Sequence, residues 1–240
     1  MGYSSGRGLP NYSVLIAGLD EWSVGGEELH DDRLVEKLKL LQEVDTLRLV
    51  EPPPDREDPT APPTGITAWQ FPEWFITQDV GEGKGLTRSR MLVHRRALTK
   101  GKYIGDDKRK HPVVPVRFVR ACPAGHIGDI DWRTFVHGPK ECQRQLWMDE
   151  RGTSGDLSEI WIRCDCGLQR ELAEAAGLQS KALGYCEGLR PWLGPYTRER
   201  CNEPNRLLIR TASNAYFPQL MSVISLPPRE HSLECGEVHS

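Results

Sequence analysis

Six of the seven cysteines lie within residues 113–227, and some of them occupy short turns of the kind that bind metal ions. One turn reads CPAGH at residues 122–126, and another reads CDCG at residues 164–167. Tight turns suit zinc because they direct thiolates inward while backbone N–H groups hydrogen-bond the sulfurs. We therefore expect this part of the chain to bind Zn2+.

Our preferred arrangement is one tetrahedral zinc ion held by the thiolates of Cys142, Cys166, Cys186 and Cys201. Cys164 can replace Cys166 in this set. Cys122 and His126 belong either to the same ion or to a second, partial site. Four thiolates leave no open coordination position, so the predicted site is structural and not catalytic.

Two other interpretations of the cysteines remain open. The thiols can be buried or exposed without any metal, as we expect for Cys235 near the C-terminus. A redox role for the pair at Cys164 and Cys166 fits less well, because redox pairs usually have the spacing Cys-x-x-Cys.

A β-hairpin is predicted to bring distant cysteines together. The segments Gln145–Glu150 and Leu157–Arg163 have the pattern of strands, and residues 151–156 form the turn between them. Antiparallel pairing about Thr153–Ser154 places Cys142 opposite residues 164–166.

Other elements are expected around this hairpin. Residues 113–121 alternate apolar and basic side chains, which predicts a strand leading directly to Cys122. Short helices are predicted around Trp132 and Phe135 and over residues 168–176. Apolar spacing predicts further helices from about Asp32 and after Pro218.

These elements together predict an α+β fold, with a zinc-ribbon-like antiparallel β module and several short helices. Residues 51–63 hold six prolines in thirteen positions and are typical of a linker. We expect an N-terminal arm, helix and linker in residues 1–63, an aromatic and basic segment in 64–112, the cysteine-rich domain in 113–227, and a tail in 228–240.

The totals favour a cytoplasmic protein. The 240 residues carry a formal charge of −3 and contain no run of the roughly 18 apolar residues that a membrane-spanning helix needs. The N-terminus lacks the basic segment and apolar core of a signal peptide. Outside a secretory pathway, cysteines are more often free thiols or metal ligands than disulfides.

The charge is distributed unevenly along the chain. Residues 84–120 contain twelve Lys and Arg against two Asp, a local formal charge of +10. Such a block suits the phosphates of DNA, an acidic protein partner, or simply a solvated surface. The candidate nucleic-acid-binding residues are Arg88, Arg90, Arg95, Arg96, Lys108, Arg109 and Lys110.

An aromatic group precedes this basic block. Trp69, Phe71, Trp74 and Phe75 fall within seven residues. They are interpreted as anchors of a small core, with a base-stacking platform as the alternative.

Four motifs in a fixed order resemble the DrmB family of the DISARM anti-phage system. They are PVRFVRACPAGHIGDIDW (115–132), the CDCG turn (164–167), CEGLRPWLG (186–194) and RTASNAYFPQLMSVISLP (210–227). The resemblance extends over about residues 66–227.

The resemblance implies a bacterial cytoplasmic protein that partners a superfamily 2 helicase, DrmA, and helps it engage foreign DNA. It also implies a helicase-associated domain with a zinc-binding cysteine cluster. The metal candidates carried over are Cys122, His126, Cys142, Cys166, Cys186 and Cys201, and the motif residues near the central interface are Arg210, Ser213, Asn214 and Tyr216.

Two departures from the family pattern stand out. Family members are usually far longer, so this chain is expected to be a short or truncated member. After FPEW at residues 71–74, where cysteines of a further ribbon are expected, the sequence reads Thr-Gln-Asp without cysteine.

The sequence therefore predicts a non-enzymatic accessory protein of phage defence that binds DNA and a helicase through a zinc-stabilised domain. No Walker A, HExxH or Gly-x-Ser-x-Gly motif is present. One alternative is a zinc-dependent hydrolytic enzyme in which Cys122 or His126 leaves a coordination position for water. The other is a structural protein-interaction module that does not bind DNA.

Overall fold

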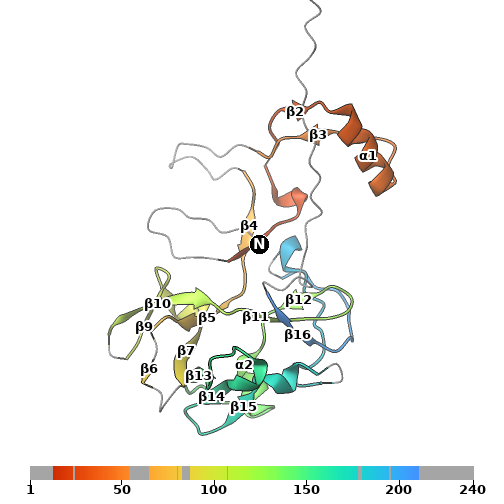
Figure 1. Ribbon diagram of the computed structural model, residues 1–240. Coiled ribbons are helices and arrows are strands. Elements are labelled where there is room, and N and C mark those ends of the chain that lie inside the picture. Colours follow the sequence, from red (N-terminus) through yellow and green to blue (C-terminus); the bar gives the residue numbers. More distant parts are fainter. Residues whose placement is uncertain are drawn as a thin grey trace, which may run out of the picture.

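The computed structural model describes residues 13–23, 25–53, 65–79, 81–82, 87–106, 108–177, 180–194 and 196–210. Within these residues the largest element is a nine-stranded antiparallel sheet (Figure 1) in the order β15-β14-β13-β7-β5-β10-β9-β8, with β6 also paired to β7. Its strands are β5 (Trp74–Thr77), β6 (Gly81–Glu82), β7 (Arg88–His94), β8 (Leu98–Thr99), β9 (Lys102–Ile104), β10 (Lys110–Pro115), β13 (Leu146–Glu150), β14 (Ile160–Cys164) and β15 (Gln169–Glu171).

The strand β13 lies between β7 and β14, and its register aligns the ends of both neighbours. Leu146 is the cross-strand partner of Leu92 in β7 and of Cys164 in β14. Because paired residues share a face of the sheet, these side chains lie in one row on the same side. Gln145 extends the alignment by donating from Nε2 to the Leu92 carbonyl at 3.0 Å.

The main hydrophobic core lies between this face of the sheet and the short helix α2 (Trp132–His137). Trp132 and Phe135 of α2 are fully buried and meet edge to face, with ring centroids 6.2 Å apart. They belong to the same buried cluster as Leu146 and Ile162 of the sheet. A smaller cluster around Phe75 and its strand neighbours covers the other face.

Helix α2 forms where the sequence provides both caps. The Asp131 carboxylate accepts hydrogen bonds from the N–H groups of Arg133 and Thr134, and the chain leaves the helix at Gly138 with φ of 61°. A capping carboxylate satisfies N–H groups that no helical carbonyl reaches, and glycine adopts positive φ without steric cost.

A second, three-stranded sheet has the order β12-β11-β16 and adjoins the large sheet in Figure 1. It consists of β11 (Phe118–Ala121), β12 (Ile127–Gly128) and β16 (Arg206–Ile209). Phe118 pairs with Ile209 and Ala121 with Arg206. This pairing joins two segments that are more than 80 residues apart in the sequence.

The N-terminal elements lie at the opposite end of the molecule from β13–β15 (Figure 1). Two small ribbons pair β1 (Val14–Ile16) with β4 (Ala68–Gln70) and β2 (Glu28–Leu29) with β3 (Leu49–Val50). Helix α1 (Asp32–Gln42) begins after Asp31, whose carboxylate accepts from the Leu34 N–H at 3.0 Å. No side chain of α1 is fully buried, so this helix contributes little to the core.

The α+β class predicted from the sequence is confirmed, since antiparallel strands combine with short helices. The predicted helices at residues 32 and 132 and the hairpin about residues 153–154 are present. The single strand predicted over residues 113–121 is divided, because its first part belongs to β10 of the large sheet and its last part is β11 of the second sheet. The helix predicted over residues 168–176 is wrong: β15 pairs with β14 there, and only Leu172–Ala175 forms a 3₁₀ turn. Further 3₁₀ turns lie at Leu19–Glu21, Arg95–Ala97, Leu157–Glu159 and Pro191–Leu193.

Three further expectations concern a domain boundary, the linker and C-terminal helix, and membrane spanning. The expected boundary between residues 112 and 113 falls inside β10, and the large sheet takes strands from both sides of it. The helix predicted after Pro218 and most of the proline-rich linker lie outside the described residues. Within the described residues, no helix is both long enough and apolar enough to cross a membrane.

Asp129 joins the two sheets, because its carboxylate accepts a hydrogen bond from the backbone N–H of Glu73 at 3.0 Å. Burial raises the pKa of Asp129 to about 6, and the nearby Glu73 carboxylate acts in the same direction. The folded protein therefore holds this proton more tightly than the unfolded chain does.

This pKa predicts a pH-dependent stability. Between about pH 4 and pH 6 the folded state binds more protons than the unfolded state, so the Asp129 contribution destabilises the fold increasingly as pH rises. Replacement Asp129→Asn is expected to remove a penalty on the order of 2–3 kcal/mol at pH 8 and roughly half of that at pH 5. Urea unfolding of both proteins at the two pH values measures this difference, and a difference independent of pH would contradict the assignment.

Candidate metal centres

Six cysteines and two histidines of the described residues form two groups, each with three thiols and one imidazole. The first, called here the Cys122 group, consists of Cys122, His126, Cys186 and Cys201. The second, called the Cys142 group, consists of His137, Cys142, Cys164 and Cys166. Within each group the possible ligand atoms all lie within 4.8 Å of one another.

The single four-thiolate set predicted from the sequence is therefore divided. Cys142 and Cys166 lie in one group, whereas Cys186 and Cys201 lie in the other. The reason is topological: the β13–β14 hairpin holds the first pair beside Cys164, while the β11–β16 pairing carries the second pair to the Cys122 turn. Cys122 and His126 belong to a complete group, and not to a partial one.

The Cys122 group is built on a tight turn that follows β11. The Cys122 N–H donates to the His126 carbonyl at 3.0 Å, and the N–H of Gly125, at φ of 86°, donates to the Cys122 carbonyl. These bonds bring the Cys122 sulfur to 3.2 Å from Nδ1 of His126. The Cys201 sulfur lies 4.0 Å from that of Cys122.

A loop over residues 187–200 brings Cys186 and Cys201 to this turn, and Gly188 is the residue that permits its shape. Its φ is 68°, and the Glu199 N–H donates to its carbonyl at 2.9 Å. A Cβ at this position would lie 1.7 Å from the Glu199 carbonyl oxygen. The Gly188 N–H also donates to the Cys186 sulfur at 3.2 Å, as backbone amides do at metal-bound thiolates.

The His126 ring is held in one orientation by Glu199. Its Nε2 lies 2.5 Å from the Glu199 carboxylate, which also accepts from Arg190 at 2.7 Å. A carboxylate on the distal nitrogen is a common way of orienting a metal-binding histidine. Although burial opposes protonation, hydrogen bonds to Cys122 and Glu199 raise the pKa of His126.

The Cys142 group forms where β13, β14 and α2 meet. The sulfurs of Cys142 and Cys164 are 3.7 Å apart, because the hairpin register places Cys142 beside the end of β14. The chain then turns at Gly167, whose φ is 98°, and the Cys166 N–H points at the Cys164 sulfur at 3.5 Å. The predicted placement of Cys142 opposite residues 164–166 is confirmed.

His137 completes the Cys142 group from the last turn of α2. Its Nδ1 lies 2.9 Å from the Arg133 carbonyl, and its Nε2 lies 3.3 Å from the Cys166 sulfur. The ring is buried, whereas Cys166 is exposed. Burial raises the pKa of Cys164 to about 11, whereas a backbone hydrogen bond from Leu168 is the main cause that lowers the pKa of Cys166 to about 7.

The geometry of both groups matches that of a tetrahedral ion with sulfur and nitrogen ligands. Zn–S bonds of about 2.3 Å and tetrahedral angles place two sulfurs about 3.8 Å apart. The S···S distances of 3.7 and 4.0 Å lie near this value. The S···N distances of 3.2 and 3.3 Å are shorter, as expected in direction from the shorter Zn–N bond of about 2.0–2.1 Å. In each group, the imidazole nitrogen that faces away from the sulfurs meets an oxygen acceptor.

Two side chains of the candidate metal centres, His137 and Glu199, were not identified from the sequence. His137 gave no signal because it stands alone at a helix end, five residues before Cys142. The separation of His137 from Cys142 is similar to that of Cys122 from His126, with the order of the two residue types reversed. This similarity was the only available indication in the sequence. Glu199 gave no signal because its position opposite His126 depends on the fold of the 187–200 loop.

The aromatic group before the basic block divides between core and surface. Phe71 and Phe75 are buried, while Trp69 and Trp74 are partly buried. Phe75 belongs to the smaller core cluster and Trp74 packs against the main one.

The basic residues of the candidate nucleic-acid-binding set lie on β7, on the 3₁₀ turn after it, and on the β9–β10 hairpin. Arg90 forms an ion pair with Glu150 at 3.9 Å, and Arg95 with Glu73 at 3.6 Å. Arg109, in the hairpin turn, is exposed. Among the described residues, exposed basic side chains without an ion pair within 4 Å include Arg88, Arg96, Lys100, Lys102, Lys108 and Lys110.

Of the four motif residues near the C-terminus, only Arg210 lies within the described chain. Its backbone N–H donates to the Arg117 carbonyl at 2.8 Å, and its guanidinium contacts the Ser13 hydroxyl. Ser213, Asn214 and Tyr216 lie outside the described residues.

The fold and these groups define a class: an α+β protein with antiparallel sheets in which two Cys3His groups link strand ends and loops. Residues 3–217 match the family described as "Domain of unknown function (DUF8724)", and the chain belongs to this family. It is 30% identical over 174 residues to "DISARM protein DrmB" of Bacillus paralicheniformis. The alignment covers 72% of this chain but 30% of that relative, so the chain spans about a third of its length. The resemblance to the DrmB family is thereby confirmed.

The steric requirement at Gly188 gives a direct test of the Cys122 group. Gly188→Ala is expected to destabilise the protein by more than the roughly 1–2 kcal/mol that positive φ alone costs a non-glycine residue, because its Cβ collides with backbone. Gly155→Ala is the matched control, since Gly155 has φ of 77° but no atom within 4 Å of the added Cβ. Equal losses of unfolding free energy in the two variants would show that the 187–200 loop tolerates the change.

Proposed function

We propose that each Cys3His group binds one zinc ion and that both ions are structural. The observation that carries this proposal is the orientation of the two imidazoles, each with one nitrogen toward thiols and the other toward an oxygen. Sulfur and imidazole ligands in tetrahedral array favour zinc over the harder cations Mg2+ and Ca2+.

The ligand count supports a structural role over a catalytic one. Each group supplies four protein donors, so a bound ion has no open position for water or substrate. We therefore propose that the chain has no hydrolytic activity of its own. The ions instead cross-link strand ends and loops that are far apart in the sequence.

We also propose that the protein is a component of a DISARM-type anti-phage defence system. The similarity to DISARM protein DrmB supports this role. Within such a system, the chain acts as an accessory that binds DNA and a DrmA-like superfamily 2 helicase.

The exposed basic side chains of the block 84–120 support the DNA-binding part of this proposal. Lys108 and Lys110 at the β9–β10 hairpin have no ion-pair partner among the described residues, and Arg96 projects from the turn after β7. Cations that are not neutralised within the protein are available to phosphates. A structural interaction module that does not bind DNA would have no need of these exposed cations.

Zinc content tests the first proposal. Freshly purified protein is expected to contain two zinc ions per chain by elemental analysis. Cys201→Ser and Cys142→Ser each remove one ligand from a different group, so each variant is expected to retain one ion. Because either variant can unfold, wild-type stoichiometry is decisive by itself: zinc near zero in the wild type would overturn the proposal.

Salt dependence tests the second proposal. Replacing Lys108, Arg109 and Lys110 together by Glu is expected to weaken DNA binding at low salt by about tenfold or more. It is also expected to lower the slope of log K against log salt by about 2–3, because each phosphate contact releases about one counterion.

A triple variant with Lys37, Lys39 and Arg48 replaced by Glu is the matched control. It makes the same change of charge on and near α1, away from the hairpin. Fluorescence anisotropy with labelled DNA measures all three proteins. Equal affinity of the hairpin variant and this control would remove the basic block from the binding surface.

A further inference from the structure

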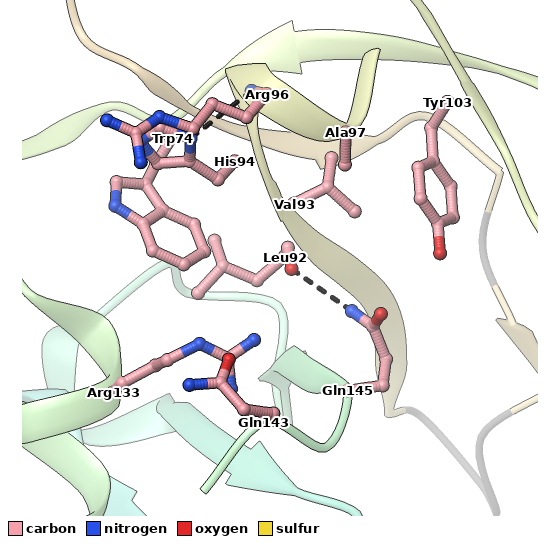
Figure 2. Close-up of a pocket in the computed structure, with 10 residues that line it drawn as sticks. All are labelled: Trp74, Leu92, Val93, His94, Arg96, Ala97, Tyr103, Arg133, Gln143 and Gln145. Carbon is pink, nitrogen blue, oxygen red and sulfur yellow. Dashed lines mark hydrogen bonds between the residues drawn. The ribbon is translucent and has the colours of Figure 1, made fainter. Parts of the chain in front are cut away.

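A hollow of about 500 Å³ opens at the end of the large sheet, where β7 ends and β13 begins (Figure 2). Its size lies within the range of roughly 300–1,000 Å³ that is usual for small-molecule sites. It is separate from both Cys3His groups in composition, since none of their eight ligands lines it. The Cys142 group nevertheless adjoins it through the chain, because Gln143 follows Cys142 directly.

Aromatic and apolar side chains form one part of the wall. Figure 2 shows Trp74 and Leu92 on one side of the hollow and Tyr103 farther along it. Trp74 is held edge to face against His94, with centroids 5.2 Å apart, and Tyr103 packs beside the smaller core cluster. Partly buried rings of this kind offer stacking surfaces that are already fixed in place.

Guanidinium and amide groups form the rest of the wall. Arg133 and Gln143 lie across the hollow from Trp74, with Arg96 at its upper side and Gln145 near Leu92 (Figure 2). Among the described residues that line it, none is Asp or Glu. The wall is therefore cationic and rich in hydrogen-bonding groups, and does not suit a cationic ligand.

Two of these polar groups are fixed before any ligand arrives. Nη1 of Arg133 donates to the carbonyls of Cys142 and Arg144 at 2.7 and 3.0 Å, which holds the guanidinium on the hollow floor. Gln145 donates from Nε2 to the carbonyls of Leu92 and Leu146, so its Oε1 remains as an acceptor. Preorganised groups of this kind reduce the entropy lost on binding.

We propose that this hollow binds one unpaired nucleobase together with its phosphate. This inference rests on the proposed DNA-binding function and names the part of the DNA that is recognised. The aromatic rings provide faces for stacking, the amides pair with the donor and acceptor groups of a base edge, and Arg96 binds the phosphate. The ligand is thus single-stranded DNA, because a base in a duplex must first be unpaired and unstacked, which has a free-energy cost.

The position of the hollow beside the basic block supports this assignment. Arg96 belongs both to the hollow and to the exposed basic side chains that follow β7. Base stacking together with a cationic path for phosphates is the usual means by which proteins bind single strands.

The test compares two labelled strands of equal length, one of ordinary deoxynucleotides and one of abasic residues, by fluorescence anisotropy with the full chain. Both carry the same phosphates, so only contacts with bases distinguish them. The wild type is expected to bind the ordinary strand about tenfold more tightly, as one stacked base contributes on the order of 1–3 kcal/mol.

Four variants locate this preference. Tyr103→Leu and Gln143→Ala are expected to abolish the preference while leaving affinity for the abasic strand unchanged. Tyr103→Phe retains the ring and is expected to keep it, as is Gln42→Ala, which removes an exposed glutamine on α1. Since Gln143 is exposed, its variant remains informative if Tyr103→Leu fails to fold.

The outcomes separate this inference from the proposed function. The triple Glu variant at Lys108, Arg109 and Lys110 is expected to weaken both strands alike and to preserve their ratio. Equal binding of the two strands by the wild type would overturn the nucleobase site while leaving DNA binding intact.

Titration with dAMP, dCMP, dGMP and dTMP, followed by NMR, covers the remaining case in which neither strand binds. A mononucleotide that binds the wild type and not Gln143→Ala would then refute DNA binding and show that the hollow takes a free nucleotide and not a single strand. No binding by strands or mononucleotides would overturn both.

Discussion

The antiparallel register of β13 positions both the Cys142 group and the hollow. Pairing Leu146 with Cys164 sets Cys142 beside the end of β14, and pairing it with Leu92 aligns the end of β7 with the start of β13. The first alignment assembles the Cys142 group and the second forms the hollow. A shift by one residue would move the apolar row of β13 to the opposite face. The burial of Leu146 and Met148 in the main core therefore also fixes the position of the Cys142 group.

Polar contacts on the other face of β13 reinforce the same register. Asp149 is buried and accepts from the Ser89 hydroxyl at 2.7 Å and from Nε of Arg163 at 2.8 Å. A buried carboxylate is stable only when its hydrogen bonds are satisfied. A change of register among β7, β13 and β14 would break these hydrogen bonds and destabilise the sheet. The sheet is thus held in one alignment by apolar packing on one side and by a charged network on the other.

The parts of the structure that the sequence predicted are those governed by local pattern. The strand patterns of residues 145–150 and 157–163 predict the hairpin, and the hairpin alone brings Cys142 to Cys164. The division into two groups was not predictable in this way, because Cys186 and Cys201 reach Cys122 only through the pairing of β11 with β16. The error over residues 168–176 has a similar origin: pairing with β14 overrides the helical tendency of this segment. His137 was missed because a lone histidine carries no periodicity.

The two imidazoles differ in the nitrogen that faces the thiols. In His126 Nδ1 faces Cys122 and Nε2 faces the Glu199 carboxylate, whereas in His137 Nε2 faces Cys166 and Nδ1 faces the Arg133 carbonyl. A metal ion bound through the nitrogen that faces the thiols would therefore select a different neutral tautomer of histidine in each group. Ring nitrogen resonances distinguish the tautomers, so the two centres carry separate spectroscopic labels. Events at either centre can be followed individually in the unmodified protein.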